Sequence, residues 1–326
     1  MSNDKRWSRR AALVGGLSLA GASMASMVQL SQKDRRGRSQ ENDHGTSGRP
    51  NAMGRQTNDS IQTLRLGWSP WADADVISLM AKELIETQLE QPVQRVMADI
   101  GIQYASVARG DLDLMLMAWL PLTHRDYWKR VRDRVADFGP MYSGQLGWVV
   151  PDYVDTKSVR SITDLQRPEI AARFNNQVQG IDPGSGLNQL SEVALRDYTL
   201  NDIKLVASSS AAMTAVLDQA IRERRWIVVT SWMPHWMFAR YNLRFLDDPL
   251  LVFGGVEWIH ALGRSGLSSA APNVANFLTR FRIPDEELTA VLLQAHRSTA
   301  EEAVQTYLNS HAERVKYWTT GSISAG

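Results

Sequence analysis

The stretch "WIVVTSWMPHWMF", residues 226–238, guides the interpretation of the rest of this chain. Its first four residues form an apolar run typical of a buried strand, and the following segment holds two further tryptophans and a histidine. In open α/β sheets, ligands bind beyond the carboxyl ends of the strands. The stretch therefore predicts a strand of an α/β protein that ends in a binding site rich in indole and poor in charge.

The chain around this stretch alternates between strand and helix patterns. Strand patterns occupy 63–67, 92–98, 112–121, 144–151, 203–209 and 226–232, and a further strand runs into a glycine turn over 178–186. Helical periodicity covers 75–89, 102–111, 187–198 and 211–224, and the chain from Pro272 onward is mostly helical. Such alternation predicts βαβ units and a largely parallel sheet, and a folded part of this length suggests two α/β lobes.

The N-terminus has the pattern of an export signal. The basic segment "KRWSRR", residues 5–10, precedes the apolar run "AALVGGLSLAGASMA". Its Arg9–Arg10 pair resembles a twin-arginine signal, so we expect residues 1–25 to be an export signal and the mature protein to be periplasmic or extracytoplasmic. The alternative is an uncleaved leader that tethers the protein to the membrane. The chain has no cysteine, which excludes disulfides, thiolate chemistry and a lipid-modified cysteine.

Residues 26–60 have few aliphatic side chains and predict a disordered linker, followed by a substrate-binding domain over 61–326. Residues 1–60 contain 10 Lys/Arg and 5 Asp/Glu; subtraction from the totals of 36 and 35 leaves 26 and 30, a net charge of −4 for the folded part. A nucleic-acid-binding domain would need a clustered basic face, so we expect no nucleic acid partner.

Three of the 11 tryptophans stand out by position. Trp71, Trp119 and Trp232 each follow or end a predicted strand and lie within two residues of a proline, which is a poor place for plain core packing. Ring faces attract a soft cation without the desolvation cost of a buried carboxylate, at roughly 2 kcal/mol per desolvated ring. These tryptophans therefore predict a carboxylate-free cage for a quaternary ammonium group. Core packing is the interpretation for Trp68, Trp128, Trp148, Trp226 and Trp318.

Four motifs resemble the substrate-binding proteins of glycine betaine/proline betaine ABC transporters, the type with a three-tryptophan box. They are "LGWSPW" at 66–71, "AWLPLTHRDYW" at 118–128, "GIDPGSGL" at 180–187 and "TSWMPHWMFARYNLRFLDDP" at 230–249, and the resemblance covers about 64–321. It implies an α/β, two-lobed periplasmic-binding-protein fold (type II, Venus flytrap) with a hinge between the lobes. We expect one lobe to comprise about 61–150 plus 251–326, and the other about 151–250.

The resemblance also implies the site. Trp71, Trp119 and Trp232 would form the box around a trimethylammonium group, while the backbone amides of Gly180 and Ile181 and the side chain of His124 would hold the carboxylate. The residues agree, since the turn after Gly180-Ile181 opens onto a helix, whose positive end favours an anion. His235 and Trp236 are expected to be structural.

The chain departs from the family pattern at three positions: Met117 stands where an aspartate is usual, Ser231 where a glycine is frequent, and Trp68 where a tyrosine is common. None removes a box residue, but they leave glycine betaine, proline betaine, carnitine and choline open as ligands. A choline binder would not need the carboxylate site.

The implied function is non-enzymatic binding of a compatible solute and its delivery, by a monomer, to an ABC transporter permease and ATPase complex for osmoprotective uptake. Nucleotide-binding, hydrolase and metal motifs all fail, so we expect no catalytic residue, no metal and no cofactor. The alternatives are a membrane-tethered module that senses betaine, choline or carnitine, and a hydrolase or lyase acting on betaines.

Overall fold

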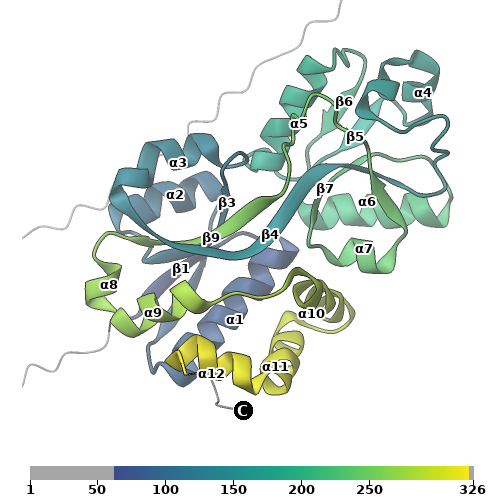
Figure 1. Cartoon of the computed structure of the whole chain (residues 1–326). Coiled ribbons are helices and arrows are strands. Elements are labelled where there is room, and N and C mark those ends of the chain that lie inside the picture. Colours follow the sequence, from purple (N-terminus) through teal and green to yellow (C-terminus); the bar gives the residue numbers. More distant parts are fainter. Residues whose placement is uncertain (1–61, 323–326) are drawn as a thin grey trace, which may run out of the picture. The chain divides into compact units, whose positions relative to one another are not determined.

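One long strand, β4 (Val135–Pro151), connects the two halves of the fold in a computed structural model that describes residues 62–322 (Figure 1). From Val135 to Gly144 it pairs antiparallel with β9 (Glu257–Arg264), and from Gln145 to Val149 it pairs antiparallel with β7 (Val229–Met233). The export signal predicted for residues 1–25 and the linker predicted for residues 26–60 lie outside the described residues. We call the halves the first lobe and the second lobe.

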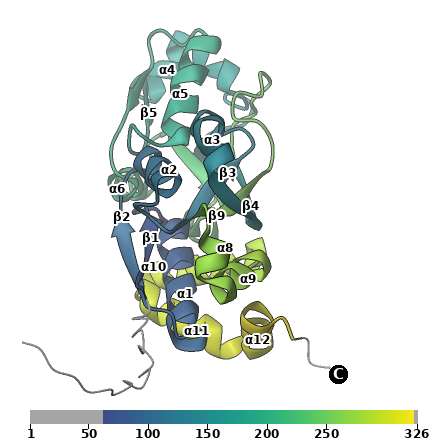
Figure 2. The same cartoon turned by 90° about the vertical axis from the view of Figure 1, so that its left-hand side faces the viewer.

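The first lobe is built on a sheet whose strands are β2 (Val93–Met97), β1 (Leu64–Trp68), β3 (Leu114–Leu120), β9 and the start of β4. Helix α1 (Ala72–Gln88) and the C-terminal helices cover one face, and α2 (Ile100–Arg109) and α3 (Arg125–Val131) cover the other (Figures 1 and 2). The C-terminal helices are α8 (Leu267–Ala270), α9 (Pro272–Arg280), α10 (Asp285–Arg297), α11 (Ala300–Ser310) and α12 (Ala312–Thr320).

The second lobe contains the end of β4 with β7, β5 (Gln177–Gln179), β6 (Lys204–Val206) and β8 (Leu243–Phe245). Its helices are α4 (Pro168–Arg173), α5 (Gly186–Asp197), α6 (Ser210–Arg222) and α7 (Trp236–Arg240), and short 3₁₀ turns occur at η1 (Arg132–Arg134), in the first lobe, and η2 (Ile162–Gln166). Trp148 on β4 is fully buried here and donates its indole N–H to Ser191 of α5 at 2.9 Å. This bond ties the crossing strand to the second lobe.

The expectation of a largely parallel sheet is correct only for β1 to β3 in the first lobe and β5 to β7 in the second, since β8 pairs antiparallel with β4. β1 pairs parallel with β2 and β3, and β5 pairs parallel with β6 and β7. The centre is antiparallel, because the chain crosses to the second lobe on β4 and returns to the first on β9. The change of partner within β4 falls between Gly144 and Gln145. The lobe ranges predicted from the sequence remain a proposal.

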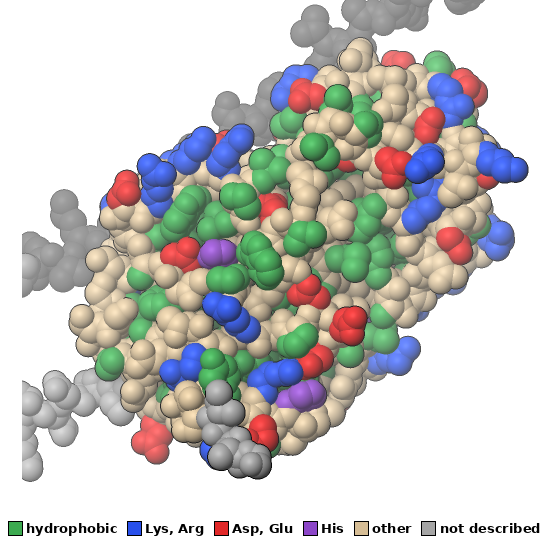
Figure 3. Space-filling view, viewed as in Figure 1, with side chains coloured by type: hydrophobic (Ala, Val, Ile, Leu, Met, Phe, Trp, Pro, Cys, Tyr) green, Lys and Arg blue, Asp and Glu red, His purple; other side chains and the backbone are tan. Residues whose placement is uncertain are grey.

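The surface carries charges of both signs (Figure 3). Basic side chains gather on α3 and η1, which hold five Lys and Arg residues beside Asp126 and Asp133. No helix among residues 62–322 combines the length and the apolar character needed to cross a membrane.

Candidate functional site

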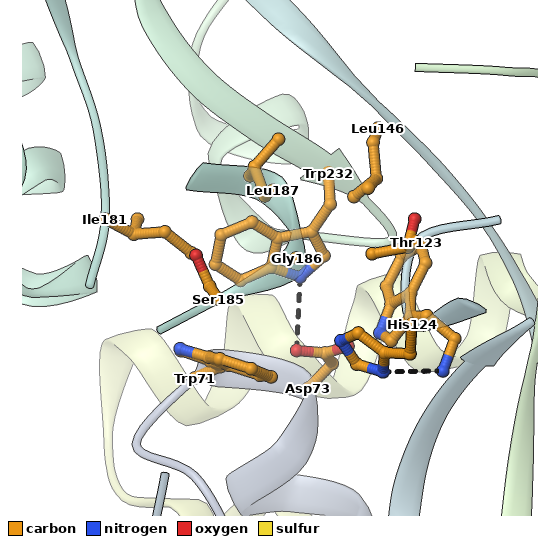
Figure 4. Close-up of a pocket in the computed structure, with 11 residues that line it drawn as sticks. Trp71, Asp73, Thr123, His124, Leu146, Ile181, Ser185, Gly186, Leu187 and Trp232 are labelled. Carbon is orange, nitrogen blue, oxygen red and sulfur yellow. Dashed lines mark hydrogen bonds between the residues drawn. The ribbon is translucent and has the colours of Figure 1, made fainter. Parts of the chain in front are cut away.

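The ends of β1, β3 and β7 meet the start of α5 at a pocket between the two lobes, with an empty volume of about 300 Å³ (Figure 4). The lining residues are Trp71, Asp73, Trp119, Thr123, His124, Leu146, Ile181, Ser185, Gly186, Leu187 and Trp232. Five of the six residues predicted from the sequence are among them; Gly180 is the exception.

The three predicted tryptophans converge on this pocket from both lobes. Trp71 is the N-cap of α1, directly after β1, and Trp119 lies near the end of β3, so both belong to the first lobe. Trp232 lies on β7 in the second lobe, and Figure 4 shows its ring above that of Trp71, which is seen nearly edge-on. The three side chains expose at most 6% of their surface, so the rings are enclosed by protein. Ring faces in such a desolvated site attract a cation.

His124 adds a neutral hydrogen-bond donor. Its Nδ1 accepts the backbone N–H of Trp119 at 3.1 Å, which leaves the proton of a neutral imidazole on Nε2. Burial lowers the pKa of His124 to about 3, only partly offset by a backbone hydrogen bond, so the ring is uncharged at neutral pH. It can therefore donate to an anionic group without placing a second cation in the pocket.

The predicted role of the Gly180 amide is wrong in this structure. That amide donates to the carbonyl of Val206 at 2.9 Å and continues the β5–β6 pairing, so it is not free to bind an anion. Ile181 does line the pocket. The start of α5 is a further source of donors, because Gly186 and Leu187 line the pocket and the first N–H groups of a helix have no intrahelical partner.

Asp73 overturns the expectation of a carboxylate-free cage. It lies in the first turn of α1, is 1% exposed, and accepts the indole N–H of Trp232 at 3.1 Å and the hydroxyl of Tyr142 at 2.9 Å (Figure 4). Burial raises its pKa to about 6, and the hydrogen bonds oppose that shift. The sequence signal was the acid two residues after Trp71, which was missed because the helix was predicted to start at Asp75 and not at Ala72.

A second buried carboxylate holds the loop between β3 and α3. Glu257 on β9 is 2% exposed and accepts the backbone N–H of Leu122, together with the N–H and hydroxyl of Thr123. This loop brings Thr123 and His124 to the pocket. Glu257 does not itself line the pocket, so it acts through the loop.

His235 and Trp236, which were expected to be structural, contact other side chains of the protein. His235 caps α7 by accepting the N–H of Met237, and its ring packs edge-on against Trp232 at 4.7 Å. Trp236 stacks on His296 of α10 in the first lobe, with ring centroids 3.6 Å apart. Among the departures from the family pattern, Met117 receives the hydroxyl of Tyr142 on its sulfur at 3.3 Å, and Ser231 is fully buried beside the box.

No group of three or more His, Asp or Glu side chains within residues 62–322 is arranged to hold a metal ion. The pocket presents aromatic rings, one carboxylate, a neutral imidazole and helix-terminal amides. Such a set suits a small zwitterion with an alkylated nitrogen.

Two α/β lobes around an enclosed aromatic pocket define a solute-binding protein of the periplasmic-binding-protein class. The family described as the substrate binding domain of ABC-type glycine betaine transport systems, OpuAC, matches residues 62–310. The chain belongs to this family.

Several known proteins are similar to this chain. The crystal structure of lactococcal OpuAC, in its closed-liganded conformation complexed with glycine betaine, has 33% sequence identity and a TM-score of 0.73, and the match covers 79% of this chain and 100% of that one. The glycine betaine, L-proline-binding protein ProX from Borrelia burgdorferi has 29% identity and a TM-score of 0.74, covering 79% and 97%.

A curated relative is the glycine betaine/carnitine transport binding protein GbuC of Listeria monocytogenes, with 37% identity over 158 residues. That alignment spans 48% of this chain and 53% of the relative, about half of each. The activity and ligand of the whole protein are therefore matters for proposal.

Proposed function

We propose that this protein is an extracytoplasmic receptor that binds a quaternary ammonium compatible solute, glycine betaine or a related betaine, and delivers it to an ABC transporter permease and ATPase complex. The observation that carries the proposal is the convergence of Trp71, Trp119 and Trp232 on one enclosed pocket. The family membership and the similarity to a betaine-bound lactococcal protein support it.

The pocket offers each end of a betaine a complementary environment. The methylated nitrogen would lie among the three rings near Asp73, where cation–π attraction and the carboxylate both favour positive charge. The carboxylate would accept from His124 and from amides at the start of α5. Because these groups come from both lobes, a ligand that contacts all of them favours the closed arrangement.

Binding without turnover is part of the proposal. The lone pair of His124 Nδ1 is already used by the Trp119 amide, and its other nitrogen carries the proton, so this ring is not placed to act as a base. The family is one of substrate-binding proteins. Incubation of purified protein with betaine, followed by product analysis, checks this point: any catalytic consumption of betaine contradicts it.

The calorimetric titration of purified protein with glycine betaine, proline betaine, carnitine and choline tests the binding proposal. We expect saturable binding of at least one betaine with a micromolar dissociation constant. We expect weaker binding of choline, since it leaves the carboxylate donors without a partner. The absence of saturation by every betaine at millimolar concentration would sink the proposal.

Export through residues 1–25 and a free, monomeric mature protein also belong to the proposal. N-terminal sequencing of the exported protein distinguishes a cleaved leader, with a start near Ser26, from an uncleaved leader that tethers a sensing module. Size-exclusion chromatography with light scattering checks the monomer.

A further inference from the structure

Two indole N–H groups of the box donate to carboxylates of the opposite lobe. The indole of Trp71, in the first lobe, donates to Asp182 in the loop after β5 of the second lobe, at 2.8 Å. The indole of Trp232, in the second lobe, donates to Asp73 in the first lobe, at 3.1 Å (Figure 4). We call Trp71–Asp182 and Trp232–Asp73 the cross-cleft pairs. Each lobe contributes one ring and one carboxylate.

The pairs exist only when the lobes are close, because each pair joins a residue of the first lobe to a residue of the second. An indole N–H is a donor without acceptor capacity, and a buried donor without a partner loses its hydration without replacement. In an open form, water can satisfy the indoles. In this structure Trp71 and Trp232 are 6% and 3% exposed, and the carboxylates of Asp182 and Asp73 accept their N–H groups.

The two carboxylates differ in their surroundings. Asp73 is 1% exposed and shares its second oxygen with the Tyr142 hydroxyl, at 2.9 Å. Asp182 is half-buried at the edge of the pocket, and it precedes the turn that leads into α5. Each carboxylate accepts the N–H of one indole and so restricts the orientation of that ring.

We propose that Asp73 and Asp182 are positioning residues that fix the rings of Trp232 and Trp71 across the cleft, so that the aromatic cage is completed only by lobe closure. The inference rests on the proposed function, since it concerns how the same site is assembled. Asp182 does not line the pocket, so its contribution to affinity acts through the Trp71 ring and the closed arrangement.

The pairs join the two lobes across the cleft, so their loss should act on dissociation of the ligand. Asp182→Ala removes the acceptor and should raise the dissociation rate of a bound betaine about tenfold, with the association rate nearly unchanged. Asp182→Asn keeps an acceptor oxygen and should restore most of the lost residence time. Asp133→Ala, at a side chain of the first lobe that is 89% exposed, is the matched control and should leave both rates unchanged.

A double-mutant cycle separates the hydrogen bond from other effects. Trp71→Phe keeps a ring and removes the N–H donor, so combining it with Asp182→Ala should raise the dissociation rate little beyond either single variant. Stopped-flow tryptophan fluorescence gives the rates, with glycine betaine as the probe. Melting curves confirm that each variant is folded.

The outcomes of these measurements are distinct. If the wild-type protein binds no quaternary ammonium compound, the proposed function fails. If it binds glycine betaine but Asp182→Ala and Asp182→Asn dissociate alike, or the effects of Trp71→Phe and Asp182→Ala simply multiply, the function stands and the cross-cleft pairs are refuted.

Discussion

The protonation of one side chain, Asp73, changes the charge of the pocket. Its pKa lies at about 6, raised from 3.8 by burial, so the carboxyl binds more protons in the folded protein than in the unfolded chain between these values. The free energy of unfolding of the empty protein therefore falls as the pH rises through that window. A cation beside the carboxylate lowers its pKa again, so ligand binding releases a proton.

This proton release predicts pH-dependent affinity. The dissociation constant for glycine betaine should decrease by up to about tenfold as the pH rises from about 5 to about 7. Asp73→Asn should abolish this dependence and weaken binding at neutral pH. Calorimetric titrations across the pH range measure both effects, and an equally steep pH profile in the Asp73→Asn variant would show that another group is responsible.

The box tryptophans provide the second prediction at this scale. Trp232→Ala removes one desolvated ring, which contributes about 2 kcal/mol, and should weaken betaine binding at least about 30-fold. Trp258→Ala is the control, since Trp258 is 49% exposed on β9 and does not line the pocket. Equal affinities of the two variants would contradict the cation–π box.

Single elements of secondary structure place the ligand-binding side chains, and the loop between β3 and α3 is the clearest case. Its residues Thr123 and His124 reach the pocket because Glu257 on β9 accepts two of its amides and the Thr123 hydroxyl. A loop is precise when its backbone donors are satisfied by a rigid neighbour. β9, the strand that returns from the second lobe, therefore also supports the site.

Removal of this support should affect affinity and stability together. Glu257→Ala leaves buried amides without acceptors and should lower the free energy of unfolding by about 1–3 kcal/mol. Betaine affinity should fall as well, because His124 loses its fixed position. Denaturant unfolding and calorimetry measure the two effects, with the exposed Glu301→Ala on α11 as control. An unchanged affinity would mean that the loop holds its conformation without Glu257.

Closure of the whole molecule depends on how closely the backbones of the two lobes can approach each other. A Cβ atom at Gly186 would lie 2.5 Å from Cγ2 and 2.8 Å from the carbonyl oxygen of Thr123 in the opposite lobe. Carbon atoms cannot approach so closely without movement of the chain. The glycine at the start of α5 therefore allows the first lobe to lie against the second.

A pair of glycine substitutions tests this requirement. Gly186→Ala should hold the lobes apart and weaken betaine binding by more than tenfold, while its melting temperature without ligand stays near that of the wild type. Gly184→Ala is the matched control, since a Cβ there meets nothing within 4 Å. Small-angle scattering with saturating betaine should show compaction for Gly184→Ala and not for Gly186→Ala; compaction of both would exclude this role for Gly186.

Local patterns in the sequence predict the elements of this fold well and their boundaries less well. The strands around 63–67, 112–121 and 226–232 and the helices around 187–198 and 211–224 are confirmed, because apolar periodicity reports which face of an element is buried. β9 was not predicted and β4 was predicted too short. Both cross between the lobes, and their pairing depends on partners far away in the chain.

The sequence by itself determined the family, the two-lobed α/β class and which three tryptophans line the pocket, because these depend on motifs contained within short stretches. Only the tertiary structure decided that Asp73 lies among the rings, that the Gly180 amide is already bonded and that Asp182 lies opposite Trp71. Those facts concern partners up to 159 positions apart in sequence. No local pattern records such partners, since they meet only when the folded lobes bring distant strand ends together.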